Sequence, residues 1–159
     1  MMTFRLQAMF CAAALTLSPL LPGNALAASP DAKGFWLTEN NKALVEFSEC
    51  EGQKMCGHIV CTANPRDETG KLKLDVENPN PDRRDQPVCG IKLIGNMTPV
   101  SQTEYKDGWV YNPRSGETYS AKVEMISPDR LKMRGFLGIS LLGKSQTWTR
   151  VEDARTGCN

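Results

Sequence analysis

The chain has 159 residues, and its 19 lysine and arginine residues almost balance its 18 aspartate and glutamate residues. A nucleic-acid-binding protein normally carries a surplus of basic residues, so this balance argues against that class. A chain of this length is expected to form one domain, which buries roughly two thirds of the surface that its unfolded state exposes. That burial is enough for a single hydrophobic core.

Residues 1–27 have the features of a secretory signal peptide. Arg5 precedes an apolar run from Leu6 to Leu21, and a small-x-small triplet ends at Ala27. Proline interrupts the apolar run, so the segment is less suited to a permanent transmembrane helix. We expect cleavage after Ala27, which leaves residues 28–159 as one domain in the periplasm or outside the cell.

Five cysteines follow this segment, and export would place them in an oxidising compartment, where disulfides form and persist. They are Cys50, Cys56, Cys61, Cys89 and Cys158. No two are spaced as Cys-x-x-Cys and the chain has a single histidine, so we predict neither a zinc site nor any other metal or cofactor. Because five is odd, at least one thiol is left over, and Cys158 beside the C-terminus is our candidate for a free or intermolecular thiol.

Two segments with period-two alternation come first, Ala43–Glu49 and Met55–Cys61, and a polar turn containing glycine joins them. Alternation of this kind predicts half-buried strands, so the two segments are expected to form a β-hairpin. The register that we expect sets three pairs opposite each other: Val45 with Cys61, Phe47 with Ile59, and Cys50 with Cys56.

This register predicts two disulfides. Directly opposed residues of a hairpin lie within disulfide reach, which indicates a Cys50–Cys56 bond across the turn. Cys61 would then point inward and pair with Cys89. That second bond would tie together the two ends of the segment between them.

Residues 64–87 form a long polar segment with four prolines and many charges. A loop of this length in a compact domain is usually functional or mobile. A short edge strand is expected at its apolar positions, Leu72, Leu74 and Val76. Its carboxylates are interleaved with opposite charges and match no calcium loop, so we favour a solvated, salt-bridged loop over an acid–base or calcium site. These carboxylates are Asp75, Glu77, Asp82 and Asp85.

The second half of the chain continues with alternating segments at Tyr119–Met125 and Leu131–Arg134, which also predict half-buried strands. Turn residues separate the strands at 106–108, 112–116 and 127–129. No long stretch has helical periodicity. Short strands with regular turns predict an antiparallel barrel or a sandwich.

Motifs spaced along the chain carry a family resemblance. They are Gly34-x-Trp36-x-Thr38, Cys50 with Cys56-Gly57-x-Ile59, Asp75-x-x-Asn78-Pro79, Pro87-x-x-Gly90, Trp109, Tyr111-Asn112-Pro113-x-x-Gly116-x-x-Tyr119, Arg134-Gly135-Phe136 and Thr147-Trp148-Thr149-Arg150. The pattern resembles a family of exported bacterial proteins, domain-of-unknown-function family 2147 (DUF2147). The resemblance covers nearly the whole chain after the signal segment.

The resemblance implies an all-β calycin fold, a small antiparallel up-and-down barrel of the lipocalin kind. Calycins typically begin with Gly-x-Trp on the first strand, and an arginine from the last strand packs over that indole. Trp36 and Arg150 occupy the matching positions, so we expect a structural cation–π pair there. The family carries no established activity, and a fold by itself does not determine function.

In a closed barrel, one face of each strand lines the interior. Aromatic and flexible residues of the second half are therefore our candidates for a ligand-binding interior. They are Trp109, Tyr111, Tyr119, Met125, Met133 and Phe136. The apolar loop Gly138–Gly143 joins the last two strands at the expected mouth, where it would gate a ligand or touch a membrane or a partner.

Neither of our two main hypotheses about function involves catalysis. The first is a periplasmic or secreted barrel that binds a small, partly apolar ligand in a cavity of about 300 Å³ or more. The second is a non-catalytic envelope domain with a structural or protein-interaction role, motivated by the apolar loop and by the lack of a recognisable catalytic constellation. An enzyme that uses the carboxylates of residues 75–85 is the least favoured alternative.

Overall fold

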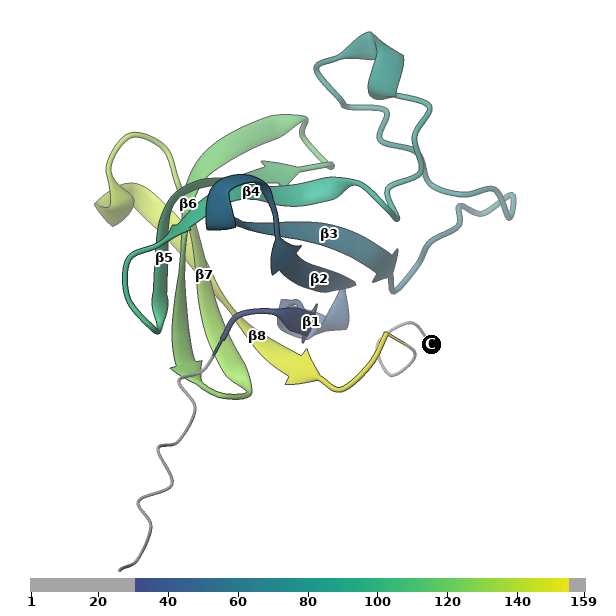
Figure 1. Ribbon diagram of the computed structural model, residues 1–159. Coiled ribbons are helices and arrows are strands. Elements are labelled where there is room, and N and C mark those ends of the chain that lie inside the picture. The colour runs from purple at the N-terminus through teal and green to yellow at the C-terminus, as the bar shows by residue number, and fades with distance from the viewer. Residues whose placement is uncertain (1–30, 155–159) are drawn as a thin grey trace, which may run out of the picture.

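The computed structural model describes residues 31–154, which form one closed β-barrel (Figure 1). Eight antiparallel strands pair in chain order, and β8 pairs with β1 to close the barrel. The small up-and-down barrel expected from the sequence is confirmed. The predicted signal segment and Cys158 lie outside the described residues. The strands are β1 (Gly34–Leu37), β2 (Ala43–Glu49), β3 (Met55–Thr62), β4 (Lys92–Pro99), β5 (Glu104–Asn112), β6 (Glu117–Ser127), β7 (Arg130–Phe136) and β8 (Gly143–Val151).

Short 3-10 helices occupy some of the connections. In the described part of the chain they are η1 (Glu39–Asn41), η2 (Glu51–Gln53), η3 (Pro81–Arg83) and η4 (Ser140–Leu142). No helix within residues 31–154 is long and apolar enough to cross a membrane. The turns predicted at 112–116 and 127–129 join β5 to β6 and β6 to β7.

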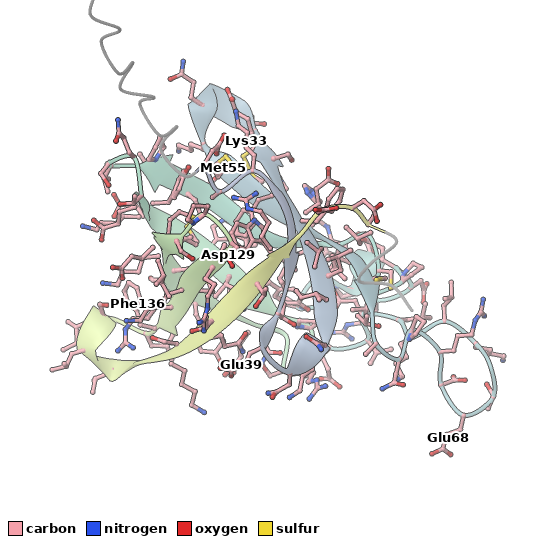
Figure 2. The ribbon with its side chains drawn as sticks, turned by 90° about the horizontal axis from the view of Figure 1, so that it is seen from below. Lys33, Glu39, Met55, Glu68, Asp129 and Phe136 are labelled. Atoms are coloured by element: carbon pink, nitrogen blue, oxygen red, sulfur yellow. A yellow bond between two sulfur atoms is a disulfide. The ribbon has the colours of Figure 1, made fainter. Side chains whose placement is uncertain are left out.

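The barrel has two ends with different connections. The end that we call closed carries residues 31–33, the β2–β3 turn and the β6–β7 turn. The other end, the mouth, carries the long β3–β4 segment, which projects away from the barrel in Figure 1, and the β7–β8 loop. Figure 2 shows Lys33 and Met55 towards the closed end, with Glu39 and Phe136 towards the mouth.

Inward-facing side chains from all parts of the sheet fill the barrel. On β6 and β7 buried residues alternate with more exposed ones, as the period-two pattern predicts. Fully burying one large apolar side chain contributes roughly 1.5–3 kcal/mol, so this core is the main source of stability. The most completely buried core side chains are Trp36, Val45, Phe47, Ile94, Met97, Val123 and Leu131.

The β2–β3 hairpin has a register that differs from the expected one by two residues. Val45 lies opposite Ile59 rather than Cys61, and the expected pairing of Phe47 with Ile59 is displaced by the same amount. The strand β3 begins at Met55, as expected, and the Met55 side chain is buried in the core. From Val45 to Glu49, a shift of two residues keeps each side chain on its expected face, so the alternation alone cannot distinguish the two registers. A bulge between Leu44 and Val45 then sets Cys61 opposite Leu44, one residue from its expected partner.

The disulfide predicted across this hairpin turn is present. Cys50 and Cys56 are bonded, with their Cα atoms 5.8 Å apart. Cys56 lies opposite Ser48 in the observed register, so the bond joins diagonal positions. A disulfide of this kind is typical of proteins from oxidising compartments.

The second predicted disulfide, Cys61–Cys89, is wrong. Cys89 is a free thiol, and Cys61 is disulfide-bonded to a different residue. The Gly90 nitrogen donates to the Ile59 carbonyl, and the Ile59 nitrogen donates to the Ile91 carbonyl. Gly90 and Ile91 therefore both lie opposite Ile59, as in a β-bulge. This extra residue prevents Cys89 from lying opposite Cys61.

A bulge replaces the turn predicted at 106–108. The strand β5 continues through this segment, and its register against β6 shifts between Tyr105 and Gly108. Asp107 has a φ of 57°, in the left-handed region that turn residues adopt. The extra residue reverses the alternation of side chains in the remainder of β5.

The long segment between β3 and β4 contains little regular structure. The edge strand expected there is not formed in the described part of the chain. Two isolated bridges, Arg66–Leu72 and Leu74–Pro87, take its place. Prolines and turn-forming residues explain why the segment loops outwards instead of extending the sheet.

Candidate functional site

Trp36 and Arg150 meet at the closed end, as the resemblance implies. The guanidinium carbon of Arg150 lies 4.2 Å from the centroid of the Trp36 ring. Trp36 is fully buried, and its Nε1 donates to the Ala32 carbonyl at 2.8 Å. The Arg150 side chain also donates to three carbonyls, those of Asp31, Lys33 and Pro128. The closed end is thus a structural clamp that joins the first described residues, the β6–β7 turn and β8.

The six candidate ligand-binding residues divide between the two faces of the barrel wall. Directly opposed residues on neighbouring strands share a face, and the buried Ala121 and Val123 mark the inner face of β6. Trp109 and Phe136 both lie opposite the exposed Ser120, and Tyr111 lies opposite the exposed Thr118. The inward-facing candidates are therefore Tyr119, Met125 and Met133, and the outward-facing ones are Trp109, Tyr111 and Phe136.

The expectation that Trp109 and Tyr111 line the interior is wrong because of the bulge at Asp107. Tyr105 faces inward, so strict alternation would also place both residues inside the barrel. The inserted residue shifts the alternation by one position, so both side chains face outward. Phe136 faces outward by the regular alternation of β7. Half of the candidate set thus lies on the outer face of the barrel wall, where Tyr111 is nevertheless buried.

Towards the closed end, side chains fill the barrel interior in place of the expected cavity. Met125 and Met133 are 5% and 4% exposed and pack into the core with Trp148. The hollows that stand out on residues 31–154 lie outside the barrel, one over β6 and β7 and the other beside Arg150. In the same residues, no three His, Cys, Asp or Glu side chains are placed to hold a metal ion. The half of the interior towards the closed end is therefore a packed core, as in many small barrels, whereas the inward-facing Tyr119 and Gly135 nearer the mouth are partly exposed.

A buried carboxylate fastens the long β3–β4 segment to the outside of the barrel. Asp75 is 1% exposed and accepts hydrogen bonds from the Tyr111 hydroxyl at 2.8 Å and from the Asn78 side-chain amide at 2.6 Å. This contact was missed when Asp75 was assigned to a solvated loop. Asp75 and Tyr111 belong to two different motifs of the family pattern, and the two motifs meet at this contact. The position of Asp75 in such a motif was the sequence signal that could have indicated its role.

Tyr111 is also the residue whose protonation reports on this contact. Burial, followed by the hydrogen bond to Asp75, raises the pKa of Tyr111 from 10.0 to about 12. The folded pKa lies above the unfolded one, so the stabilisation is fully present below pH 10 and is lost as the pH rises towards 12.

We therefore expect a late tyrosine ionisation in an ultraviolet absorbance titration of the folded protein. The step should occur near pH 12 and disappear in Tyr111→Phe, because that variant has no hydroxyl beside Asp75. Tyr119→Phe serves as the control, since Tyr119 lies on the other face of the wall and bonds Glu117 instead. Burial also raises the pKa of Tyr105, and the hydrogen bond to Glu117 raises that of Tyr119, so the readout is the amplitude of the step near pH 12. An amplitude that is unchanged in Tyr111→Phe would contradict the assignment.

The loop between β7 and β8, residues 137–142, exposes large apolar side chains at the mouth. We call this segment the mouth loop. The exposed fractions are 62% for Leu137, 60% for Ile139, 82% for Leu141 and 73% for Leu142. Clusters of exposed apolar side chains mark sites that contact proteins, membranes or ligands.

One arginine holds the mouth loop in its conformation. The Nε of Arg134 donates to the Ser140 carbonyl at 2.8 Å, and one terminal nitrogen donates to the Leu141 carbonyl at 3.1 Å. The other terminal nitrogen donates to the Ser145 hydroxyl at 2.8 Å. Arg134 thereby connects the outer face of β7 to both the loop and the start of β8.

An aromatic row on the outer face leads to the mouth loop. Trp109 and Phe136 are both half-buried and lie on either side of Ser120, across β5, β6 and β7. The Trp109 indole covers Gly95 of β4, where an added Cβ would lie only 2.3 Å from the ring. The missing side chain at Gly95 lets the indole lie against the sheet.

Positive charge predominates on the outer face of β6 and β7 beside this row. Lys122 lies opposite Arg134, and Glu124 lies opposite Lys132. These three cations and one carboxylate line a shallow hollow. The ion pairs found within residues 31–154 include none of the four side chains. The mouth loop therefore adjoins a cationic strip.

Comparisons with known proteins agree with this architecture. The sequence profile of a family described as an uncharacterized protein conserved in bacteria (DUF2147) matches residues 34–150. Among solved structures, the chain is similar to protein HP1028 from the human pathogen Helicobacter pylori, which is described as belonging to the lipocalin family. The two are 27% identical with a TM-score of 0.68, over 79% of this chain and 86% of that one. A search of curated proteins found no match.

Proposed function

This chain belongs to the bacterial family DUF2147, and we propose that it is a non-catalytic binding protein whose mouth loop docks onto an apolar partner in the cell envelope. Export with cleavage after Ala27, to the periplasm or the outside, is part of the proposal. The Cys50–Cys56 disulfide supports an oxidising compartment.

The exposure of the mouth loop is the observation that carries this proposal. Leu141 and Leu142 are 82% and 73% exposed, and burying a leucine in a partner contributes roughly 1.5–3 kcal/mol. Arg134 already orders the backbone that presents them. A loop that is ordered before binding loses less conformational entropy when it docks.

A loop variant tests the proposal. We expect Leu141→Ser/Leu142→Ser to weaken binding to isolated bacterial envelope membranes by roughly tenfold or more, because two apolar contacts are lost. Co-sedimentation of the purified protein with the membranes measures the change. Ile126→Ser is the matched control, since Ile126 is 54% exposed but lies near the closed-end terminus of β6. Unchanged binding by the loop variant, or an equal loss in the control, would count against the proposal.

A small apolar ligand is a second candidate for the binding partner, and the likeness to a lipocalin-family protein supports it. Because the closed-end half of the interior is packed, such a ligand would sit in the half nearer the mouth. In that half, Lys144 and Gln146 lie opposite the inward-facing Gly135 and Met133 and therefore face inward as well. The side chains of Lys144 and Gln146 are nevertheless exposed, so this part of the interior is accessible.

Native mass spectrometry of protein purified without detergent distinguishes this candidate. An excess mass of small-molecule size that is lost on denaturation would support a ligand at the mouth. A bare polypeptide mass would leave docking of the mouth loop as the function to pursue.

A further inference from the structure

We propose that the apolar partner of the mouth loop is an anionic lipid bilayer, entered by the loop's apolar side chains and held at its surface by Lys122, Lys132 and Arg134. The inference rests on the proposed function and adds the chemistry of the partner. It combines the exposed apolar loop with the cationic strip beside it.

The backbone of the mouth loop is prepared for an apolar medium. An unsatisfied backbone carbonyl or amide is costly inside a bilayer. Here the carbonyls of Ser140 and Leu141 accept hydrogen bonds from Arg134, and the Ile139 carbonyl accepts one from the Leu142 nitrogen at 3.1 Å. Three consecutive carbonyls at the tip of the loop are therefore satisfied internally.

The arrangement of the apolar side chains also suits a bilayer. Four large apolar residues occupy a six-residue loop, and the most exposed of them, Leu141, is 82% accessible in the η4 turn. A projecting apolar tip inserts into lipid without requiring a shaped pocket in a partner protein. The half-buried Trp109 and Phe136 lie on the outer face below the loop, and aromatic side chains favour the boundary between lipid and water.

Charge complementarity identifies the lipid headgroups as anionic. Lys122, Lys132 and Arg134 face outward together with a single carboxylate, Glu124, and they have no ion-pair partner within residues 31–154. Arg134 contacts the mouth loop directly, so the strip and the apolar tip belong to one surface. Basic residues beside an apolar insertion are attracted to the negative potential of anionic membranes.

Vesicle binding tests the inference directly. Co-sedimentation would use phosphatidylcholine vesicles with and without about one third phosphatidylglycerol, in low salt and in about 0.5 M salt, which shortens the range of charge interactions. We expect the protein to bind the anionic vesicles at least tenfold more tightly than the neutral ones, with weaker binding in high salt. Leu141→Ser/Leu142→Ser should lose binding to both kinds of vesicle.

Matched charge variants complete the experiment. Lys122→Gln/Lys132→Gln should lower affinity for anionic vesicles severalfold while leaving weak binding to neutral ones unchanged. Lys71→Gln/Lys73→Gln removes the same charge from exposed positions of the long β3–β4 segment and should have little effect. Circular dichroism spectra should match for all variants, which separates loss of binding from loss of folding.

The outcomes separate this inference from the proposed function. Binding to envelope membranes without binding to pure anionic vesicles would overturn the lipid assignment and point to a protein partner for the same loop. Vesicle binding that survives the loop substitutions would overturn it as well. Absence of binding to both preparations would overturn the proposed function itself.

Discussion

Replacing Trp36 by alanine is expected to lower the free energy of unfolding by about 3–5 kcal/mol, which is the usual cost of deleting a buried aromatic ring. Trp36 is 0% exposed, bonds the Ala32 carbonyl and lies beneath Arg150. Its loss removes the packing that joins the first described residues to the last strand. Equilibrium denaturation with urea measures the change, and a loss below about 1 kcal/mol would contradict the role of Trp36 as a core residue.

A double-mutant cycle isolates the contribution of the arginine above the ring. Trp36→Phe keeps an aromatic face, and Arg150→Met keeps much of the side-chain volume while it removes the charge. Direct contact between the two groups predicts a coupling energy of about 0.5–2 kcal/mol in the Trp36→Leu/Arg150→Met cycle, and a smaller one with Trp36→Phe. Additive effects of Trp36→Leu and Arg150→Met would show that the stacked arrangement contributes little to stability.

Gly116→Ala is expected to destabilise the protein by about 3 kcal/mol and to release the long β3–β4 segment. Gly116 has a φ of 69°, and an added Cβ would lie 2.0 Å from the Glu77 carbonyl oxygen. Because the obstacle is backbone rather than a flexible side chain, the segment has to move away from the β5–β6 turn. That movement would break the hydrogen bond between Asp75 and Tyr111. Urea denaturation and limited proteolysis of residues 64–87 measure the two effects.

Gly70→Ala is the matched control for this prediction. Gly70 also has a positive φ, 80°, and lies in the same long segment, but nothing lies within 4 Å of an added Cβ. Backbone strain alone costs about 1–2 kcal/mol in the left-handed region. Similar losses for the two variants, or unchanged proteolysis of Gly116→Ala, would show that Glu77 does not pack against the turn as described.

The strands β2, β3, β6 and β7 were predictable because each shows period-two alternation in the sequence. The bounds of β2 coincide with the alternating segment Ala43–Glu49, in which Val45 and Phe47 are buried while Glu46 and Ser48 are exposed. Trp36 and Arg150 follow from the family resemblance, and the barrel brings them together. The hairpin register was not predictable from alternation, because a shift of two residues leaves every side chain on the same face.

The candidate site was harder to predict because single inserted residues decide which way side chains point. Asp107 reverses the faces of Trp109 and Tyr111, and Gly90 displaces Cys89 from Cys61. Both insertions resemble ordinary turn signals in the sequence. The apolar mouth loop was predictable from composition, but the hydrogen bonds by which Arg134 holds it depend on the tertiary fold.

The burial of Asp75 illustrates a different difficulty. Charged loop residues are mostly solvated, so a carboxylate among prolines and arginines is normally assigned to the surface. The residue that buries it, Tyr111, is 36 positions away in the chain and faces outward only because of the bulge. The contact between Asp75 and Tyr111 therefore depends on the tertiary fold and not on the local sequence around Asp75.

Closure of the barrel by β1 and β8 has a consequence for the order of folding. The bonds from Arg150 to the carbonyls of Lys33 and Asp31 connect residues 117 and 119 positions apart. The other strand pairs join chain neighbours, so they can form locally, whereas the final seam must wait for the last strand. Until β8 is in place, the growing sheet has unpaired edges that can associate with other chains. Protection from such association therefore arrives only when β8 has paired with β1.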